Sequence, residues 1–180
     1  VTNAGTAHCA VPTTGGDAYL VIWTTTPWTL YGNAAVAAHP NARYAVVKTP
    51  KGALIIAERL LESAFKDIGI DSAGAHKISV ILGKELEDLE YEHPFLKDGL
   101  TRKVVLADYV SQEEGTGLVH IAPGHGMEDY HVGLKYKLPI LMPVDKQGRF
   151  DATVKDFTGQ KVFEANKKII EKLESLNCLL

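Results

Sequence analysis

Apolar residues along the chain occur mostly in short runs separated by turn residues, a pattern typical of a protein built from many short strands. Runs rich in β-branched and aromatic side chains predict strands over residues 18–24, 43–49, 53–57, 77–82, 103–106, 118–122 and 140–144. Helices are predicted over residues 58–68 and 162–176, where apolar residues have amphipathic spacing, and near residues 127–136, after a glycine-rich turn. We therefore expect an α/β (α+β) fold with a compact β-barrel-like core of short strands and about three peripheral helices.

The length of 180 residues suits one domain with its own hydrophobic core. Residues 1–17 begin with a mostly small and polar stretch and are expected to form a linker or a loosely ordered N-terminal edge, with the domain itself in residues 18–180. The acidic stretch 85–92 is expected to be a solvated connection. Because the sequence begins with Val1 and not with methionine, we expect a piece of a longer protein.

The composition of the chain limits the cellular compartments and the binding partners that we expect. A net charge of −3 gives no sign of a surface that binds a polyanion by itself, so any contact with RNA must be local or must use sequence outside this chain. The two cysteines, Cys9 and Cys178, form neither a disulfide framework nor a paired metal set, which favours a reducing cytoplasmic compartment. No signal peptide is evident, and polar and turn residues interrupt the apolar stretch 18–38, so we expect no membrane span. We also expect a monomer.

The first segment with candidate functional residues holds three consecutive threonines, Thr24, Thr25 and Thr26, at the end of a predicted strand. Pattern alone favours a strand end followed by a proline turn. Two tryptophans, Trp23 and Trp28, flank the turn, and indole rings beside hydroxyl groups also suit an apolar pocket wall that can bind a polar ligand. Both interpretations stay open at this point.

The second segment covers residues 114–130, where four glycines and a proline surround a short apolar run and a helix then begins. Glycines allow a backbone to approach a ligand closely, although their spacing fits neither a phosphate-binding loop nor a dinucleotide fingerprint. Glu128 and Asp129 lie in the first turn of the predicted helix, where they could serve the helix dipole or a functional site.

A metal site is a weaker interpretation of the same segment. His120, His125 and His131 lie close together in sequence, with Asp129 among them. Their spacing does not match the His-Glu-x-x-His zinc pattern, and no cysteine is near. We therefore expect no metal and no other cofactor.

Together the two segments resemble the isoleucyl-tRNA synthetases, class I enzymes that carry an inserted editing domain. The likeness rests on residues 23–30, on His39-Pro40 and on residues 115–130, and it continues into the tail from Gly159 to Ile170. The related valyl and leucyl enzymes have arginine, proline and an acid in place of residues 26–28, and they generally lack a histidine at the position of His120. The chain departs from the family pattern at Tyr31-Gly32, and the signature motifs of the synthetic site are absent from this sequence.

The resemblance implies the editing-domain fold and a hydrolytic activity without a cofactor. Its substrate would be valine esterified to the acceptor end of isoleucine tRNA, and its other partner would be the rest of the synthetase chain. The resemblance implies roles for residues of both segments, with Thr24, Thr25 and Asp129 as catalytic residues and Thr26, Trp28, His120, Gly124, His125 and Asp129 as substrate-binding residues.

Within that set, Asp129 would hold the α-ammonium group of the substrate, and His120 would limit the size of its side chain. Thr24 and Thr25 would hold the ester and order a directly attacking water, because no Ser-His-Asp or Cys-His arrangement is evident in the sequence. Two alternatives stay open, a non-catalytic module that binds the tRNA acceptor end and a metal-dependent hydrolase.

Overall fold

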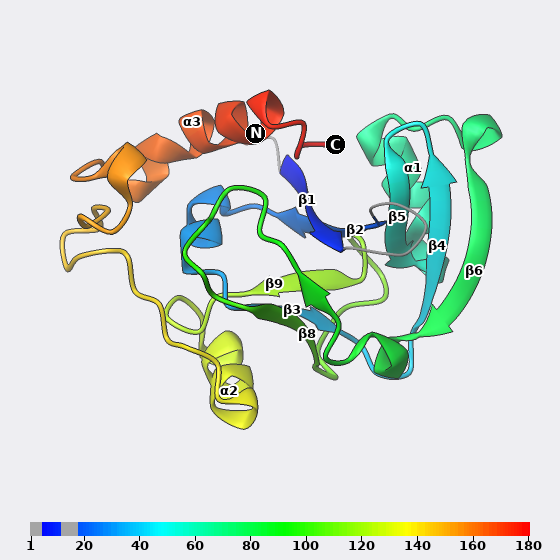
Figure 1. Cartoon of the computed structure of the whole chain (residues 1–180), viewed down its shortest axis with the longest axis horizontal. Helices are drawn as coiled ribbons and strands as arrows, with labels where there is room; N and C mark the ends of the chain where they lie inside the picture. The colour runs from blue at the N-terminus through cyan, green and yellow to red at the C-terminus, as the bar shows by residue number, and fades with distance from the viewer. Residues whose placement is uncertain (1–4, 12–17) are drawn as a thin grey trace.

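The computed structural model describes residues 5–11, for their backbone only, and residues 18–180. Nine strands form a five-stranded sheet of order β1-β2-β5-β4-β6 and a four-stranded sheet of order β7-β8-β3-β9 within these residues (Figure 1). The strands are β1 (Gly5–Val11), β2 (Ala18–Thr24), β3 (Ala35–Ala38), β4 (Arg43–Thr49), β5 (Gly52–Ala57), β6 (His76–Leu82), β7 (Glu90–Tyr91), β8 (Arg102–Leu106) and β9 (Leu118–Ile121).

Three α-helices and five short 3-10 helices join and cover the sheets within the same described residues. The α-helices are α1 (Leu61–Ile68), α2 (Met127–Tyr136) and α3 (Val162–Ser175). The 3-10 helices are η1 (Pro27–Gly32), η2 (Glu58–Leu60), η3 (Ser72–Gly74), η4 (Gly83–Leu86) and η5 (Lys155–Phe157).

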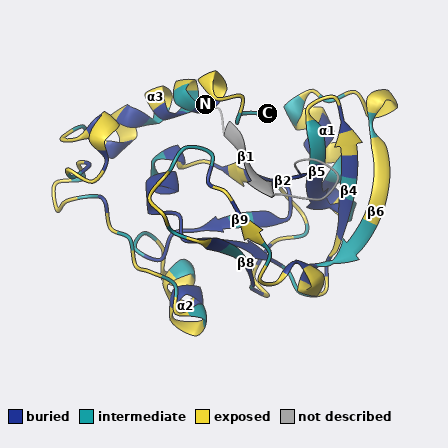
Figure 2. Ribbon diagram, viewed as in Figure 1, coloured by how far each residue is buried: buried dark blue, intermediate teal, exposed yellow. Residues whose placement is uncertain are grey.

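The mixed α/β fold class and the three helices are confirmed, but the strands do not close into a barrel. β2 pairs with β5, and β3 with β8, in parallel, while the remaining pairs are antiparallel. The largest apolar cluster draws on both sheets and on α3, through buried residues that include Leu20, Val36, Leu118 and Ile169. Figure 2 shows these inner strands buried and the outer sides of the helices exposed.

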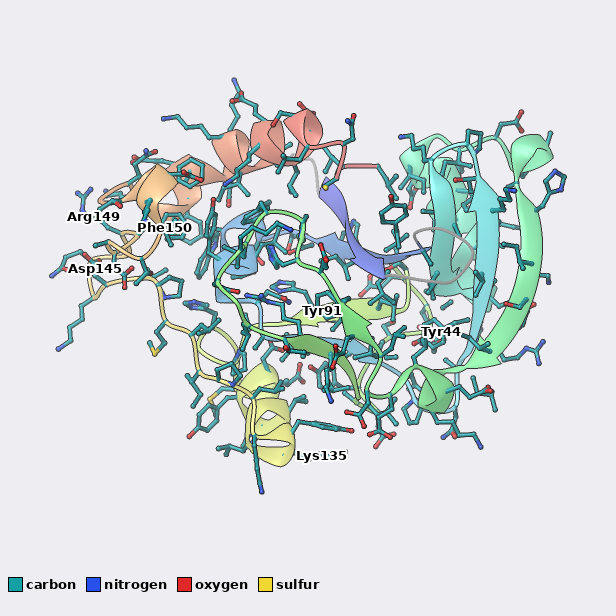
Figure 3. The ribbon with its side chains drawn as sticks, in the orientation of Figure 1. Tyr44, Tyr91, Lys135, Asp145, Arg149 and Phe150 are labelled. Carbon is teal, nitrogen blue, oxygen red and sulfur yellow. The ribbon has the colours of Figure 1, made fainter. Side chains whose placement is uncertain are left out.

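Tyr44 of β4 ties the five-stranded sheet to the segment that leads into β9. Its hydroxyl donates to the Gly117 carbonyl at 2.6 Å and accepts from the His39 amide at 2.9 Å (Figure 3). Gly117 has φ of +74°, and a Cβ there would lie 2.3 Å from the Ala57 side chain, so only glycine fits this turn. The turn before β9 is thereby held against the end of β5.

Most predicted elements are found, with small shifts at their ends. β2, β4 and α2 have the predicted bounds, and the predicted helix over 58–68 consists of η2 followed by α1. α1 ends at Gly69 in the left-handed conformation, as its glycine predicts.

Two predictions about local structure were wrong. Residues 140–144 form no strand, and only Val144 makes an isolated bridge, to Phe150. Prolines at 139 and 143 cannot donate to a sheet ladder, which explains this result. The acidic stretch 85–92 is not simply solvated, because Leu86 and Tyr91 are buried and the stretch contains part of η4 and all of β7.

Part of the predicted N-terminal linker forms the edge strand β1. It pairs antiparallel with β2, from Gly5 opposite Thr24 to Val11 opposite Ala18. The other residues before Ala18 lie outside the described part of the chain.

Candidate functional site

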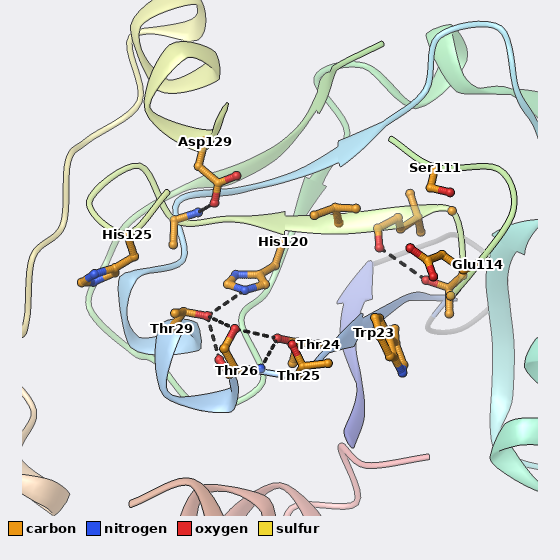
Figure 4. A pocket seen from close by; sticks show the side chains of 16 residues that line it. Trp23, Thr24, Thr25, Thr26, Thr29, Ser111, Glu114, His120, His125 and Asp129 are labelled. Carbon is orange, nitrogen blue, oxygen red and sulfur yellow. Dashed lines mark hydrogen bonds between the residues drawn. The ribbon is translucent and has the colours of Figure 1, made fainter. Parts of the chain in front are cut away.

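A pocket of about 300 Å³ lies where the end of β2, η1, the turn before β9, β9 itself and the start of α2 meet (Figure 4). It brings together residues from the two segments that the sequence singled out, almost a hundred residues apart. The lining residues are Trp23, Thr24, Thr25, Thr26, Thr29, Ser111, Glu114, Gly115, Thr116, Gly117, Leu118, Val119, His120, Ala122, His125 and Asp129.

The threonines form a connected group where the chain leaves β2. The buried Thr24 hydroxyl accepts from the Thr26 amide at 3.1 Å, which turns the chain into η1. The Thr26 hydroxyl lies 3.4 Å from the hydroxyl of Thr24 and 3.5 Å from that of Thr29. The threonine side chains thus line one wall of the pocket as a row of hydroxyl groups.

The imidazole of His120 is held by Thr29, a residue whose role the sequence did not reveal. Thr29 donates its single hydroxyl proton to the Thr26 carbonyl at 2.8 Å, and its oxygen lies 2.9 Å from His120 Nε2. Because that proton is already used, Nε2 must carry the ring proton and donate it to Thr29. His120 Nδ1 is then a bare acceptor, buried and without a hydrogen-bond partner among the described residues.

Burial also fixes the charge of this ring. It lowers the pKa of His120 to about 4, against an opposing effect of the Asp129 carboxylate and with a small further lowering from His125. His120 is therefore neutral near pH 7 and presents an uncharged wall to the pocket.

Asp129 is oriented from outside its own helix. Its Oδ2 accepts from the Ala122 amide at 2.8 Å, and its Oδ1 accepts from the Tyr109 hydroxyl at 3.3 Å. Both bonds reach residues upstream of α2, so the carboxylate bridges the end of β9 to the loop at Tyr109. Burial raises the pKa of Tyr109, and the Asp129 carboxylate raises it further, so the phenol stays a donor.

Of the other expected site residues, only His125 lines this pocket within the described part of the chain. His125 is half-buried and lines the pocket, and burial lowers its pKa. Trp28 is not among the lining residues; its ring packs edge-on against His125, with centroids 4.9 Å apart, and against Phe163. Gly124 lines a separate shallow groove beside Met142, where its lack of a Cβ lets the Leu141 carbonyl pass.

On the far side of the pocket, the sequence suggested Trp23 as a wall residue but gave no role to Ser111 or Glu114. Trp23, Ser111 and Glu114 lie on that side, opposite the group formed by His120, His125 and Asp129 (Figure 4). Glu114 and Trp23 lie within the two segments that the sequence singled out, so their positions in the sequence pointed to the site. Tyr109 gave none, because its link to Asp129 exists only in the folded chain.

No group of three or more histidine, cysteine, aspartate or glutamate side chains suited to a metal ion occurs in residues 18–180, whose side chains the structure describes. Within the same residues, every helix is too short or too polar to cross a bilayer.

Comparison with known proteins relates the whole sequence to one group of enzymes. The isoleucine–tRNA ligase of Fervidobacterium pennivorans is 48% identical over 164 residues, which are 91% of this chain and 17% of that protein. The isoleucine–tRNA ligase of Chromobacterium violaceum is 45% identical over 180 residues, which are 100% of this chain and 19% of that protein. The chain thus spans less than a fifth of the length of these relatives.

Solved structures identify the fold. GlLeuRS-CP1 matches with a TM-score of 0.75 at 14% identity, over 99% of this chain and 98% of that one. The editing domain of the P. knowlesi cytosolic leucyl-tRNA synthetase matches with a TM-score of 0.74 at 12% identity, over 98% and 95% of the two chains. The chain is a homologue of part of the isoleucine–tRNA ligases, with the fold of a synthetase editing domain. The resemblance found in the sequence is thereby confirmed, although no family model matches the chain.

Proposed function

We propose that this editing domain hydrolyses the ester bond of valine wrongly attached to isoleucine tRNA, after transfer, by direct attack of water. The observation that carries the proposal is the pairing of a carboxylate, Asp129, with a buried neutral imidazole, His120, in one pocket of about 300 Å³. An aminoacyl ester offers a matching pair of features, an ammonium group and a small apolar side chain.

The Asp129 carboxylate binds the α-ammonium group. A carboxylate has about four acceptor sites, and the bonds from Ala122 and Tyr109 use two of them. A charge-assisted bond to the ammonium group is worth about 1.5–3 kcal/mol and fixes the orientation of the substrate. Ligands without a free amine lose this bond and should therefore bind more weakly.

His120 limits the size of the amino-acid side chain. One methylene contributes only about 1–3 kcal/mol in a pocket that accepts it, a general limit for which the isoleucyl enzymes are themselves the standard example. The editing pocket selects in the opposite sense: it accepts the smaller valine side chain and rejects isoleucine, whose extra methylene would overpack it. The Thr29 bond that immobilises the His120 ring supports this role, since a mobile ring would yield to isoleucine.

Thr24 and Thr25 hold the ester and order the attacking water. The Thr24 hydroxyl is buried and already accepts from the Thr26 amide, whereas Thr25 is exposed and its hydroxyl has no hydrogen bond within residues 18–180. An aminoacyl ester is activated, so positioning of water can supply much of the acceleration.

A covalent route through Thr29 is disfavoured by the direction of its hydrogen bonds. The Thr29 proton goes to the Thr26 carbonyl, and His120 donates to the Thr29 oxygen, so the imidazole cannot take the hydroxyl proton in this arrangement. Thr29 is itself buried. We therefore assign Thr29 a positioning role, in which it orients the His120 ring.

The proposed partners follow from the same assignment. They are the acceptor end of isoleucine tRNA carrying valine and the remainder of the synthetase, which makes up more than four fifths of the relatives. With a net charge of −3, the domain carries no excess of positive charge for RNA, so the remainder of the synthetase strengthens binding of the tRNA. We place the protein in the cytoplasm as a monomer.

Hydrolysis assays test the proposal against its two alternatives. We expect this chain to release valine, and not isoleucine, from esterified isoleucine tRNA over many turnovers. Stoichiometric binding without turnover would support a non-catalytic module that binds the acceptor end. Loss of turnover with a chelator would support a metal-dependent hydrolase.

A further inference from the structure

The side chain at the N-cap position of η1 does not cap this helix. Thr26 occupies the cap position, where a threonine ordinarily accepts a hydrogen bond from one of the next amides. Among the described residues its hydroxyl makes no such bond and instead lies near Thr24 Oγ1 and Thr29 Oγ1, lining the pocket. Pro27 has no amide proton, so the Trp28 amide is the first donor of η1 that needs a partner.

Asn166 of α3 supplies that partner from 138 residues away. Its Oδ1 accepts from the Trp28 amide at 3.1 Å, and both residues are partly buried. α3 also reaches the other end of η1, because Lys172 Nζ donates to the Tyr31 hydroxyl at 3.4 Å. Lys172 is itself held by an ion pair with Asp156 and lies over the Phe95 ring.

We propose that Asn166 is a positioning residue for the editing pocket, which caps η1 in place of Thr26 and so leaves the Thr26 hydroxyl in the pocket wall. The catalytic consequence rests on the function proposed above, whereas the capping itself does not. Without Asn166, the Trp28 amide lacks its acceptor, and the Thr26 hydroxyl two residues before it can accept from it, because local capping bonds of this kind form readily. Thr26 then rotates out of the wall, and its contacts with Thr24 and Thr29 are lost.

NMR spectroscopy of the labelled 180-residue chain tests the cap independently of any activity. In Asn166→Ala we predict a changed χ1 rotamer of Thr26, measured by three-bond couplings, with the Trp28 amide still partly protected from exchange. In Asn166→Ala combined with Thr26→Val no cap remains, and exchange of the Trp28 amide should be fastest. An unchanged Thr26 rotamer in the single variant, or wild-type protection in the double variant, overturns the proposal.

Hydrolysis of valyl-tRNA by the same variants tests the consequence for the pocket. Asn166→Ala should lower kcat/KM by roughly tenfold, the scale of one misplaced hydrogen-bonding group. Asn166→Asp keeps an acceptor oxygen and should restore the rate. Lys167→Ala is the matched control on the same helix, because its side chain is exposed and its ion pair with Glu171 is long, at 4.0 Å.

The two sets of results separate the two claims. Alanine is a better helix former than asparagine, so a slower Asn166→Ala variant cannot be attributed to a weaker α3. If the wild-type chain hydrolyses the ester and Asn166→Ala does so at the same rate, the positioning role is wrong and the proposed function stands. If the wild-type chain hydrolyses nothing, the proposed function fails, and the Thr26 rotamer still decides whether Asn166 sets the pocket wall.

Discussion

His120 on β9 donates from Nε2 to the hydroxyl of Thr29 on η1, across 2.9 Å and 91 residues of sequence. Both side chains are buried, and the bond joins the two motifs that the sequence singled out. It fixes the tautomer and the orientation of the ring that is proposed to limit the size of the substrate's side chain. The position of this ring should therefore depend on Thr29.

Replacing Thr29 with valine should loosen the ring without changing the volume of the wall. The buried Nε2–H then lacks an acceptor, which should lower the free energy of unfolding by about 1–3 kcal/mol. Discrimination between valyl and isoleucyl esters should also fall, because the ring can move aside. Urea unfolding measures the first effect, and the ratio of the two hydrolysis rates measures the second. Thr158→Val, which removes a hydroxyl that donates to the Val154 carbonyl and does not line the pocket, is the control.

Replacing His120 with alanine should remove the size limit itself. Without the imidazole the pocket has space for the extra methylene of isoleucine, so the variant should hydrolyse isoleucyl-tRNA, which we expect the wild-type chain to spare. Release of labelled isoleucine from charged tRNA is the measurement. If His120→Ala still spares isoleucine while it hydrolyses valine, another residue limits the size of the side chain.

The buried histidines should make the fold sensitive to acid. The pKa of His120 is lowered to about 4, and that of His93 to about 3, in both cases chiefly by burial. In the unfolded chain these rings bind protons near pH 6.5, so below that pH the unfolded state takes up more protons than the folded state. The free energy of unfolding should therefore fall as the pH drops from about 6.5 towards 4.

Denaturant unfolding at a series of pH values checks this dependence. The slope between pH 6.5 and 4 should decrease in His93→Gln, whereas His76→Gln, at an exposed position, should leave it unchanged. A wild-type stability that is flat over this range would show that the two rings are protonated in the folded state. The same lowered pKa predicts that valine hydrolysis has no inflection near pH 6.5 from His120.

Arg102 should be important for the stability of the segment that follows η1. Its buried guanidinium donates to both carboxylate oxygens of Asp98 and, at 3.1 Å, to the Asn33 carbonyl. Removal of these donors in Arg102→Met should lower the free energy of unfolding by about 1–3 kcal/mol. Lys97→Met, which breaks the exposed pair with Glu92, should change it by less than about 1 kcal/mol. Equal effects of the two substitutions would contradict a structural role for Arg102.

The sequence predicted those parts of the fold whose signals are local. The helix α2 was found from the glycine turn and the first-turn acids, and α1 was ended correctly by Gly69. β3 was missed because three of its four residues are alanines, which have little strand preference and are buried here only by the neighbouring strands. Residues 140–144 were predicted as a strand because apolar composition outweighed the two prolines.

The site was predicted in part for the same reason. The motifs identified Thr24, Thr25, Thr26, His120, His125 and Asp129, all of which line one pocket. The partners that orient them come from distant segments, such as Tyr109 for Asp129 and Asn166 for Trp28. Hydrogen bonds of this kind have no pattern in a single sequence, because they depend on how separate elements pack.

The most direct test compares valine release from valyl-tRNA by the wild-type chain and by Asp129→Ala, with isoleucyl-tRNA as the second substrate. We predict selective hydrolysis of the valyl ester by the wild type and a loss of at least about tenfold in the variant, because one charge-assisted bond of about 1.5–3 kcal/mol is removed. Circular dichroism should show the same fold in both proteins. Undiminished valine release by a folded Asp129→Ala variant, or equal hydrolysis of both esters by the wild type, would contradict the proposed function.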